Sequence, residues 1–315
     1  MRKKNFYKKL IQRVKSAVRV SRIPRSFSKK NNNVFNNEQH IAMQVLMQLE
    51  KKRLRDMPAF LELLIIELEL PRIPCFSTIN KFTLRIKPMW IYALISNLVK
   101  SNQRTLVAID GTGFSLIKRS TYFSTIVGEI KQFIQCVAAA DIKRKLITAV
   151  RLRRRKRNEN IDVDYLMKST RKQMPVDVFV GDKAFDSKKN YDRAEKYGAR
   201  FIAPIRDMKR GYKVWDHRRR KLAKDFPREI YNKRAIIESI FSVIKRKFGS
   251  LVYGKKFQAQ KNEVLFRVMV YDVERLVNNS LRNYLLSTKP RTLPFLFCNN
   301  HKSNNSCRII FPKFF

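Results

Sequence analysis

Apolar positions recur with two periods along this chain, and together they predict alternating strands and helices. Helical spacing covers residues 162–172 and 188–197, where Gly198 supplies a stop, and it returns from residue 231. Short apolar runs, the pattern of buried strands, occupy residues 105–109, 132–141, 146–152, 176–180 and 200–204. The order of three strands, helix, strand, helix, strand and helix predicts an α/β protein with a mixed β-sheet flanked by helices.

The first hundred residues have a mostly helical pattern instead. Residues 1–30 spread Lys and Arg among apolar positions, and an Asn-rich break covers 31–37. Helical spacing then runs from 38 to 70, and after a proline interruption Ser77 is predicted to cap the next helix. This region could bind a nucleic acid as a basic arm with helices, or it could be a helical layer for dimerisation or packing.

Two predicted strands are followed directly by aspartate. Residues 105–109 precede Asp110-Gly111-Thr112-Gly113, which we interpret as a tight turn, and residues 176–180 precede Gly181 and Asp182. Asp-Gly is also an ordinary hairpin signal, and an Asp after a strand can serve only a strand-to-helix loop. Alternatively, the two strands bring both carboxylates to one edge of the sheet.

A third carboxylate lies on a helix predicted for residues 231–245. Tyr231, Arg234, Glu238 and Lys245 fall within an arc of roughly 80° at 3.6 residues per turn, and apolar positions fill much of the rest. Arg234 and Glu238 could instead form an ordinary surface ion pair. Three carboxylates with cations beside them suit magnesium chemistry on phosphodiesters, because Mg²⁺ prefers oxygen ligands and two ions can stabilise both the attacking and the leaving oxygen.

The charge of the chain points to a nucleic acid partner independently of these residues. The formal net charge is +44, from 69 Lys and Arg against 25 Asp and Glu. Such a field attracts polyphosphate and makes a basic protein or a small neutral molecule an improbable main partner. Two basic clusters are expected to contact phosphate, although solvated loops would look the same; their arginines are Arg153, Arg154, Arg155, Arg157, Arg218, Arg219 and Arg220.

The helix residues and the two aspartates together resemble a known family, the DDE transposases of bacterial and archaeal insertion sequences. Residues 231–245 reproduce its Tyr-(2)-Arg-(3)-Glu-(6)-Lys signature without any departure in spacing. Asp110 and Asp182 match its first and second aspartates, and residues 262–277 resemble the apolar helix that follows the signature. The resemblance covers roughly residues 70–280.

The resemblance implies a ribonuclease H-like core that cleaves DNA at transposon ends and transfers the strands into target DNA. It assigns Asp110, Asp182 and Glu238 as catalytic residues and ligands of Mg²⁺ or Mn²⁺, with two ions expected. Tyr231, Arg234 and Lys245 would contact DNA. Pairing of two transposon ends implies at least a dimer in the active complex.

One part of the family pattern has little room in this chain. Only 55 residues separate Asp182 from Glu238, so the large β-domain that some relatives insert there is not expected. Trp215, within this segment, could stack on a flipped DNA base, as an aromatic does in relatives, or it could pack on its own sheet.

These observations predict three regions. They are a basic, helical, DNA-binding region over residues 1–100, a catalytic domain over 101–280 and a tail of unknown role over 281–315. With no secretory signal and no apolar stretch long enough to span a membrane, a cytoplasmic protein is expected. Two other functions remain open: a ribonuclease H-like nuclease or resolvase without strand transfer, and a DNA-binding protein that has lost catalysis.

Overall fold

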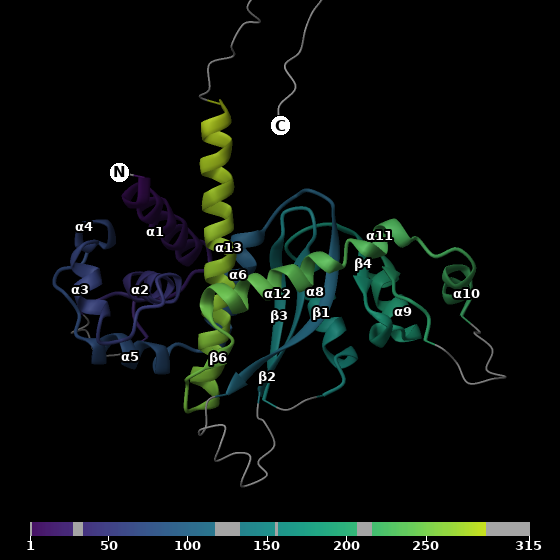
Figure 1. The fold of residues 1–315 in the computed structure, drawn as a ribbon, viewed down its shortest axis with the longest axis horizontal. Helices are drawn as coiled ribbons and strands as arrows, with labels where there is room; N and C mark the ends of the chain where they lie inside the picture. The colour runs from purple at the N-terminus through teal and green to yellow at the C-terminus, as the bar shows by residue number, and fades with distance from the viewer. Residues whose placement is uncertain (1, 28–33, 117–132, 155–156, 207–215, 288–315) are drawn as a thin grey trace, which may run out of the picture. The chain divides into compact units, whose positions relative to one another are not determined.

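The computed structural model describes residues 2–27, 34–116, 133–154, 157–206 and 216–287 (Figure 1). Residues 1–278 form one compact unit and residues 279–315 a second, and the first contains the entire sheet. Within the described ranges, no helix has both the length and the apolar character needed to cross a bilayer.

A six-stranded mixed sheet forms the centre of the first unit. Its strands run in the order β3-β2-β1-β4-β5; β2 is antiparallel to both neighbours, β4 and β5 are parallel to β1, and the short β6 pairs with the far end of β1. This is a ribonuclease H-like arrangement and confirms the predicted fold class. The strands are β1 (Thr105–Leu116), β2 (Phe133–Asp141), β3 (Leu146–Arg153), β4 (Val176–Gly181), β5 (Arg200–Ile202) and β6 (Leu251–Val252).

Strand β1 differs from its prediction, because it continues through the Asp110-Gly111-Thr112-Gly113 segment and ends only at Leu116. The predicted tight turn is wrong. Strand β2 pairs with this whole stretch, from Asp110 opposite Ala138 to Ser115 opposite Phe133, so its backbone groups are taken up by the sheet. Pairing with a distant strand therefore overrides the local turn preference of Asp-Gly.

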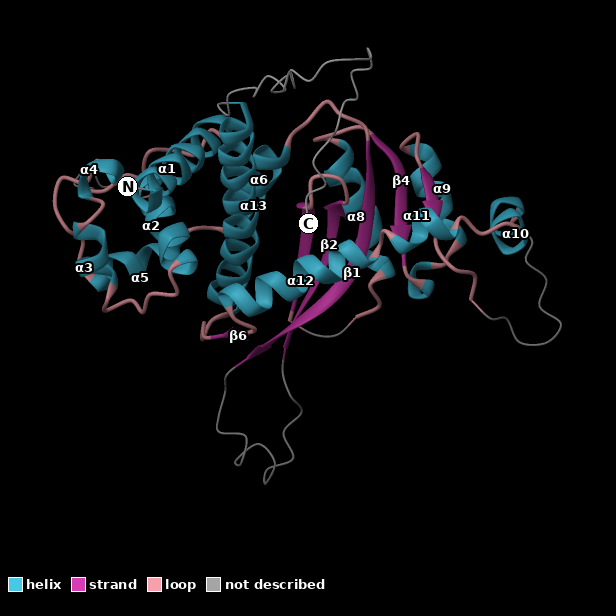
Figure 2. Cartoon of the chain, turned by 45° about the horizontal axis from the view of Figure 1, so that its top comes forward, coloured by secondary structure: helices cyan, strands magenta, loops and turns pink. Residues whose placement is uncertain are grey.

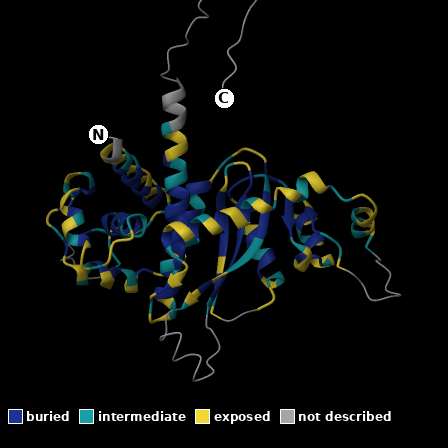
Figure 3. Cartoon of the chain, in the orientation of Figure 1, coloured by how far each residue is buried: buried dark blue, intermediate teal, exposed yellow. Residues whose placement is uncertain are grey.

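Helices lie on both faces of the sheet (Figure 2). The helix α12 runs along β1 on one face, and its apolar side, including Ile237, Ile240 and Ile244, is buried. Figure 3 shows the complementary pattern, with β2 and β3 buried and parts of α12 exposed. The core helices are α8 (Asn160–Arg171), α9 (Lys188–Lys196), α10 (His217–Lys224), α11 (Arg228–Asn232), α12 (Ala235–Phe248) and α13 (Phe257–Ser287), with a short 3₁₀ helix at Lys183–Phe185.

The described part of the N-terminal region contains helices joined by loops and no strand. Its helices are α1 (Arg2–Val20), α2 (Asn37–Leu49), α3 (Met57–Glu62), α4 (Ile65–Leu68), α5 (Phe76–Arg85) and α6 (Pro88–Val99). Two details differ from prediction. The helical pattern of 38–70 is broken into three helices, and α5 begins one residue before Ser77, with Cys75 as its N-cap and no side-chain cap. The hydroxyl of Ser77 instead lies 3.0 Å from the Cys75 sulfur.

The long helix α13 fastens the N-terminal helices to the core. The Asn262 side-chain amide donates hydrogen bonds of 2.9 Å to the carbonyls of Thr83 and Ile86, at the C-terminal end of α5. Gln258 donates to the carbonyls of Leu84 and Ile86 at 3.1 Å. These bonds satisfy carbonyls that a helix end leaves without intrahelical partners, so α5 is held in a fixed position on α13.

Candidate active site

Asp110 and Asp182 are brought together by the pairing of two parallel strands. Ile109 of β1 is the partner of Gly181 at the end of β4, so each aspartate follows a paired position. Asp110 remains in the sheet, where its Oδ1 accepts a 2.8 Å hydrogen bond from the Gly111 N–H. Asp182 leaves the sheet and caps the 3₁₀ helix, accepting 2.9 Å from the N–H of Ala184.

The signature residues do not lie on one continuous helix, as the sequence predicted. Tyr231 lies on α11, and α12 begins at Ala235 with Arg234 as its N-cap. The joint keeps right-handed helical dihedrals at Lys233 and Arg234, but its backbone bonds span three residues, including Arg234 N–H to the Tyr231 carbonyl at 2.9 Å. A tightened 3₁₀-type turn therefore replaces one α-helical turn.

Arg234 stands between two of the three carboxylates. Its Nη1 lies 3.3 Å from Asp110 Oδ2, and its Nη2 lies 2.7 Å from Glu238 Oε1. Arg234 and Asp110 are largely buried, whereas Glu238 is half exposed. Among the described residues, no three acidic, histidine or cysteine side chains are gathered closely enough to form a ready metal site. The guanidinium thus occupies the position between Asp110 and Glu238.

The three carboxylates nevertheless act on one another electrostatically. Burial raises the pKa of Asp110 to about 6, with repulsion from Asp182 and Glu238 adding to the effect, while the Gly111 N–H and Arg234 act in the opposite direction. An aspartate with a raised pKa near two other carboxylates is a site where a cation would be stabilised. The donor set consists of oxygens alone, which suits a hard divalent ion such as Mg²⁺.

Lys245 covers β1 further along the same face. Its Nζ donates a 2.6 Å hydrogen bond to the Thr112 hydroxyl and lies 5.6 Å from the centre of the Phe114 ring. Residues 110, 112 and 114 share one face of the strand, because side chains alternate along it. Partial burial lowers the pKa of Lys245. The two cations of α12 therefore flank the Asp110 face of β1, one at each end.

Tyr231 has a structural position. It packs on a small apolar cluster around Val178, Val180 and Ile202, and its ring meets that of Phe226 edge to face at 5.2 Å. The guanidinium of Arg234 lies 5.8 Å from the centre of the Tyr231 ring. Tyr231 therefore supports the arginine from the side of the sheet core.

Glu159 is a nearby carboxylate that sequence reasoning missed. It lies at the start of α8, on the opposite side of β1 from Asp110, and a Cβ on Gly111 would be only 2.1 Å from its Oε1. Its Oε1 accepts a 3.2 Å hydrogen bond from Gln135. Only the glycine beside Asp110 hinted at this close approach.

The predicted DNA-binding arginines fall into different settings. Arg153 pairs with buried Asp162 at 2.5 Å, and Arg219 pairs with buried Asp186 at 2.6 Å. Arg218 is held by three carboxylates, including Glu195 at 2.5 Å. Arg154, Arg157 and Arg220 are exposed, whereas Arg155 and Trp215 lie outside the described residues.

Comparison with known proteins gives one family. The sequence profile described as "Transposase DDE domain" matches residues 101–273, more than half of the chain. No curated protein matches the sequence significantly. Among solved structures, a piggyBac transposase synaptic complex with hairpin DNA aligns at TM-score 0.46 and 11% identity, covering 89% of this chain and 74% of that one. The Drosophila P element transposase strand transfer complex aligns at TM-score 0.31 and 11% identity, covering 88% and 87%.

Proposed function

Because the chain belongs to the transposase DDE domain family, we propose that Asp110, Asp182 and Glu238 are the catalytic carboxylates of this DDE-type DNA transposase. The reaction would be cleavage at transposon ends followed by transfer of the freed 3′-hydroxyl into target DNA. The observation that carries the proposal is the register of β1 with β4, in which Asp110 and Asp182 each follow one residue of the same strand pair. Glu238 is linked to Asp110 through Arg234, which forms an ion pair with both carboxylates.

The same three carboxylates would hold the divalent metal that enzymes of this family use. Two Mg²⁺ or Mn²⁺ ions are the expected set, and when bound they would stabilise charge on the attacking and leaving oxygens of the phosphodiester. The all-oxygen donors and the raised pKa of Asp110 fit such a cation. For this set to close, the Arg234 guanidinium would move away from the space between Asp110 and Glu238.

Arg234 and Lys245 would then act on DNA. Arg234 has a fork of donors that matches phosphate geometry, and it already lies next to the carboxylates. Lys245 lies beside Thr112 on the same face of β1. Both cations would offset the charge that develops on the phosphoryl oxygens in the transition state. Tyr231, packed beneath Arg234, would orient it.

The remaining parts of the proposal concern partners. With a net charge of +44, the chain is suited to hold transposon-end and target DNA. We assign recognition of the transposon end to the helical region over residues 1–100, and phosphate contacts to the exposed Arg154, Arg157 and Arg220. A dimer or larger assembly on paired ends and a cytoplasmic location complete the proposal.

The experiment is strand cleavage of labelled DNA that carries the terminal inverted repeat of the element encoding this chain. Full-length protein is tested in Mg²⁺, in Mn²⁺ and in EDTA, with Glu238→Gln alongside and a target plasmid present. Metal-dependent cutting at the repeat boundary followed by joining supports the proposal. Cutting without joining would favour a nuclease, and cleavage that persists in Glu238→Gln would remove that residue from the site.

A further inference from the structure

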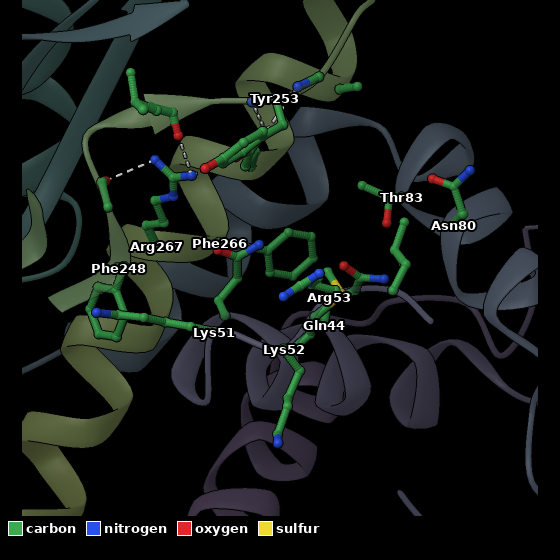
Figure 4. Close-up of a pocket in the computed structure, with 18 of the residues that line it drawn as sticks. Gln44, Lys51, Lys52, Arg53, Asn80, Thr83, Phe248, Tyr253, Phe266 and Arg267 are labelled. Atoms are coloured by element: carbon green, nitrogen blue, oxygen red, sulfur yellow. Dashed lines mark hydrogen bonds and ion pairs between the residues drawn. The ribbon is translucent and has the colours of Figure 1, made fainter. Parts of the chain in front are cut away.

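A basic groove lies beyond Lys245, between the N-terminal helices and the end of α12. Its volume is about 1160 Å³ (Figure 4). One wall is formed by the loop at residues 51–54 and by α5, and the other by residues 249–256, which connect α12, β6 and α13. Lys245 lines this groove as well as the candidate active site, so the two are contiguous.

The second wall is a rigid platform, residues 249–254. The Arg267 guanidinium donates to the carbonyls of Gly249 at 2.9 Å and Leu251 at 2.7 Å. Glu263, which pairs with Arg267 at 2.5 Å, accepts hydrogen bonds from the N–H groups of Tyr253 and Gly254 at 3.0 and 3.1 Å. Side chains of α13 therefore satisfy four backbone polar groups in one short segment, and the loop conformation is fixed.

The glycine that ends the platform adds to this fixation. A Cβ on Gly254 would be 2.8 Å from the backbone nitrogen of Gln260, so the segment packs directly on the first turn of α13. Gln260 also donates a 2.8 Å hydrogen bond to the Gly254 carbonyl. The opposite wall is fastened to the same helix, through the bonds from Asn262 to α5. Because α13 holds both the platform and α5, these parts of the two walls are fixed before any ligand binds.

Charge in the groove is strongly positive. Its lining contains seven basic side chains and one acidic side chain, and that acid, Glu263, is already paired with Arg267. The other basic residues are Lys51, Lys52, Arg53, Lys245, Lys255 and Lys256. The lining therefore has six more basic than acidic side chains, and this excess of positive charge favours an anionic occupant.

An exposed aromatic side chain lies on the platform. Tyr253 keeps 69% of its surface exposed although its backbone is held on both sides by α13 contacts. Figure 4 shows Tyr253 on one side of the groove and Lys51 and Arg53 on the other. An aromatic face beside a row of cations is the combination that binds single-stranded nucleic acid, because bases stack on the ring while cations contact phosphates.

The position of the groove also favours a single strand. Lys245 lines both the groove and the candidate active site, so a strand whose phosphate lies at the carboxylates can continue directly into the groove. The unpaired bases of a single strand can stack on Tyr253, whereas the bases of a duplex are held inside the helix. On the basis of the proposed transposase function, we propose that this groove binds a single DNA strand leaving the carboxylate site, with one base stacked on Tyr253.

The test measures binding of the full-length protein to a fluorescein-labelled single-stranded oligonucleotide and to the same sequence as a duplex, in EDTA. Tyr253→Ala should weaken single-strand binding roughly 5- to 150-fold, whereas Tyr253→Phe, which keeps the ring, should leave it near the wild-type value. A 2-aminopurine base in the strand should be quenched by the wild type and by Tyr253→Phe, but not by Tyr253→Ala.

The matched charge variants are Lys255→Gln with Lys256→Gln in the groove, and Lys188→Gln with Lys189→Gln on the exposed start of α9. The groove pair should lower the salt slope of single-strand binding by about 1.4, since each phosphate contact contributes about 0.7, and the α9 pair should lower it less. The proposal is overturned if the two lysine pairs lower the salt slope equally, or if Tyr253→Ala binds the single strand as tightly as the wild type. It is also overturned if Tyr253→Ala loses duplex binding and single-strand binding to the same extent.

These readouts separate the groove from the catalytic proposal. Binding is measured without metal, and Glu238→Gln should bind the single strand at least as tightly as the wild type. If the transposon-end cleavage assay fails while the Tyr253 series behaves as expected, only the catalytic assignment falls. If cleavage occurs and the Tyr253 variants bind alike, only the groove assignment falls.

Discussion

The two ends of α12 lead to sites that are built in opposite ways. At its start, Asp110, Glu238 and Arg234 form a cluster in which one guanidinium serves two carboxylates and burial raises the pKa of Asp110 to about 6. Beyond its end, Arg267 and Glu263 satisfy each other and the platform backbone. The first cluster keeps a surplus of negative charge for a cation, whereas the second is complete and serves as a support.

The largest effect is expected from neutralising one of the three carboxylates of the candidate active site. Glu238→Gln, Asp182→Asn and Asp110→Asn should each reduce transposon-end cleavage at least about 1000-fold, because each removes a charged oxygen donor from the proposed metal set. DNA binding should be unchanged or tighter, since a negative charge beside phosphate is lost. The measurement is single-turnover cleavage beside a binding isotherm.

The control for this prediction is Asp177→Asn. Asp177 lies on β4, the strand that leads to Asp182, but its side chain is about half exposed and pairs with Arg104 at 2.9 Å. Cleavage by this variant should stay within a few-fold of wild type. An equal loss in the control and in Asp182→Asn would show that charge on the strand, and not the site, is responsible.

The next largest effect is expected from separating the Glu263 and Arg267 pair beyond the end of α12. Glu263→Gln leaves the buried Arg267 charge without its carboxylate and should lower the free energy of unfolding by about 3 to 5 kcal/mol. The exposed pair of Arg104 and Asp177 should contribute only about 0.2 to 1 kcal/mol. Urea unfolding of Glu263→Gln and Arg104→Gln compares the two directly, and similar losses would contradict the supporting role given to Arg267 and Glu263.

A smaller effect of opposite sign sharpens the comparison. A folded-state pKa of about 6 for Asp110, against an ordinary 3.8, means that its contribution to stability is present below about pH 4 and is lost as pH rises through 6. In EDTA at pH 8, Asp110→Asn should therefore raise the free energy of unfolding by up to about 3 kcal/mol, at 1.36 kcal/mol per pKa unit.

The measurement is urea unfolding in EDTA at pH 8 and pH 4. The gain from Asp110→Asn should be much smaller at pH 4, where the carboxyl is protonated in the folded state and, with its ordinary pKa of 3.8, partly protonated in the unfolded state. Added Mg²⁺ at pH 8 should stabilise the wild type and leave the variant almost unaffected. If Asp110→Asn is instead less stable than the wild type at pH 8, the attraction between Arg234 and the ionised Asp110 outweighs the free-energy cost of burying that carboxylate.

The smallest expected effect concerns the contact between Lys245 and Thr112. Thr112→Val removes the 2.6 Å hydrogen bond but keeps the shape of the side chain. A double-mutant cycle with Lys245→Met should give a coupling energy of about 1 to 2 kcal/mol in cleavage. No coupling would show that Lys245 acts without its anchor on β1.

The fold could be predicted largely because its strands are runs of buried apolar residues, and because Gly198 and the helical spacing mark the extent of α9. Errors arose where a distant partner overrides a local signal. Asp-Gly at 110–111 is a turn signal in isolation, but β2 supplies partners along the whole stretch. The error at Ser77 is local instead, because the helix begins at Phe76 after Cys75 and the Ser77 hydroxyl lies 3.0 Å from the Cys75 sulfur.

The candidate site could be predicted in its residues but not in its present contacts. The spacing of Tyr231, Arg234, Glu238 and Lys245 is readable, whereas the tightened turn at Lys233 depends on how α11 packs on β4. Nothing in the sequence shows that Arg234 bridges Asp110 and Glu238. The platform could not be predicted from the sequence either, because its hydrogen bonds come from Glu263 and Arg267, about ten or more residues away.

The close contact between Gly111 and Glu159 predicts how these two positions vary among relatives of this chain. A Cβ at position 111 would lie 2.1 Å from the Glu159 Oε1, so the Glu159 carboxylate would have to turn away and give up its hydrogen bond from Gln135. Among relatives, a larger residue at 111 should therefore be found together with a shorter or differently turned side chain at 159, so the two positions should change as a pair.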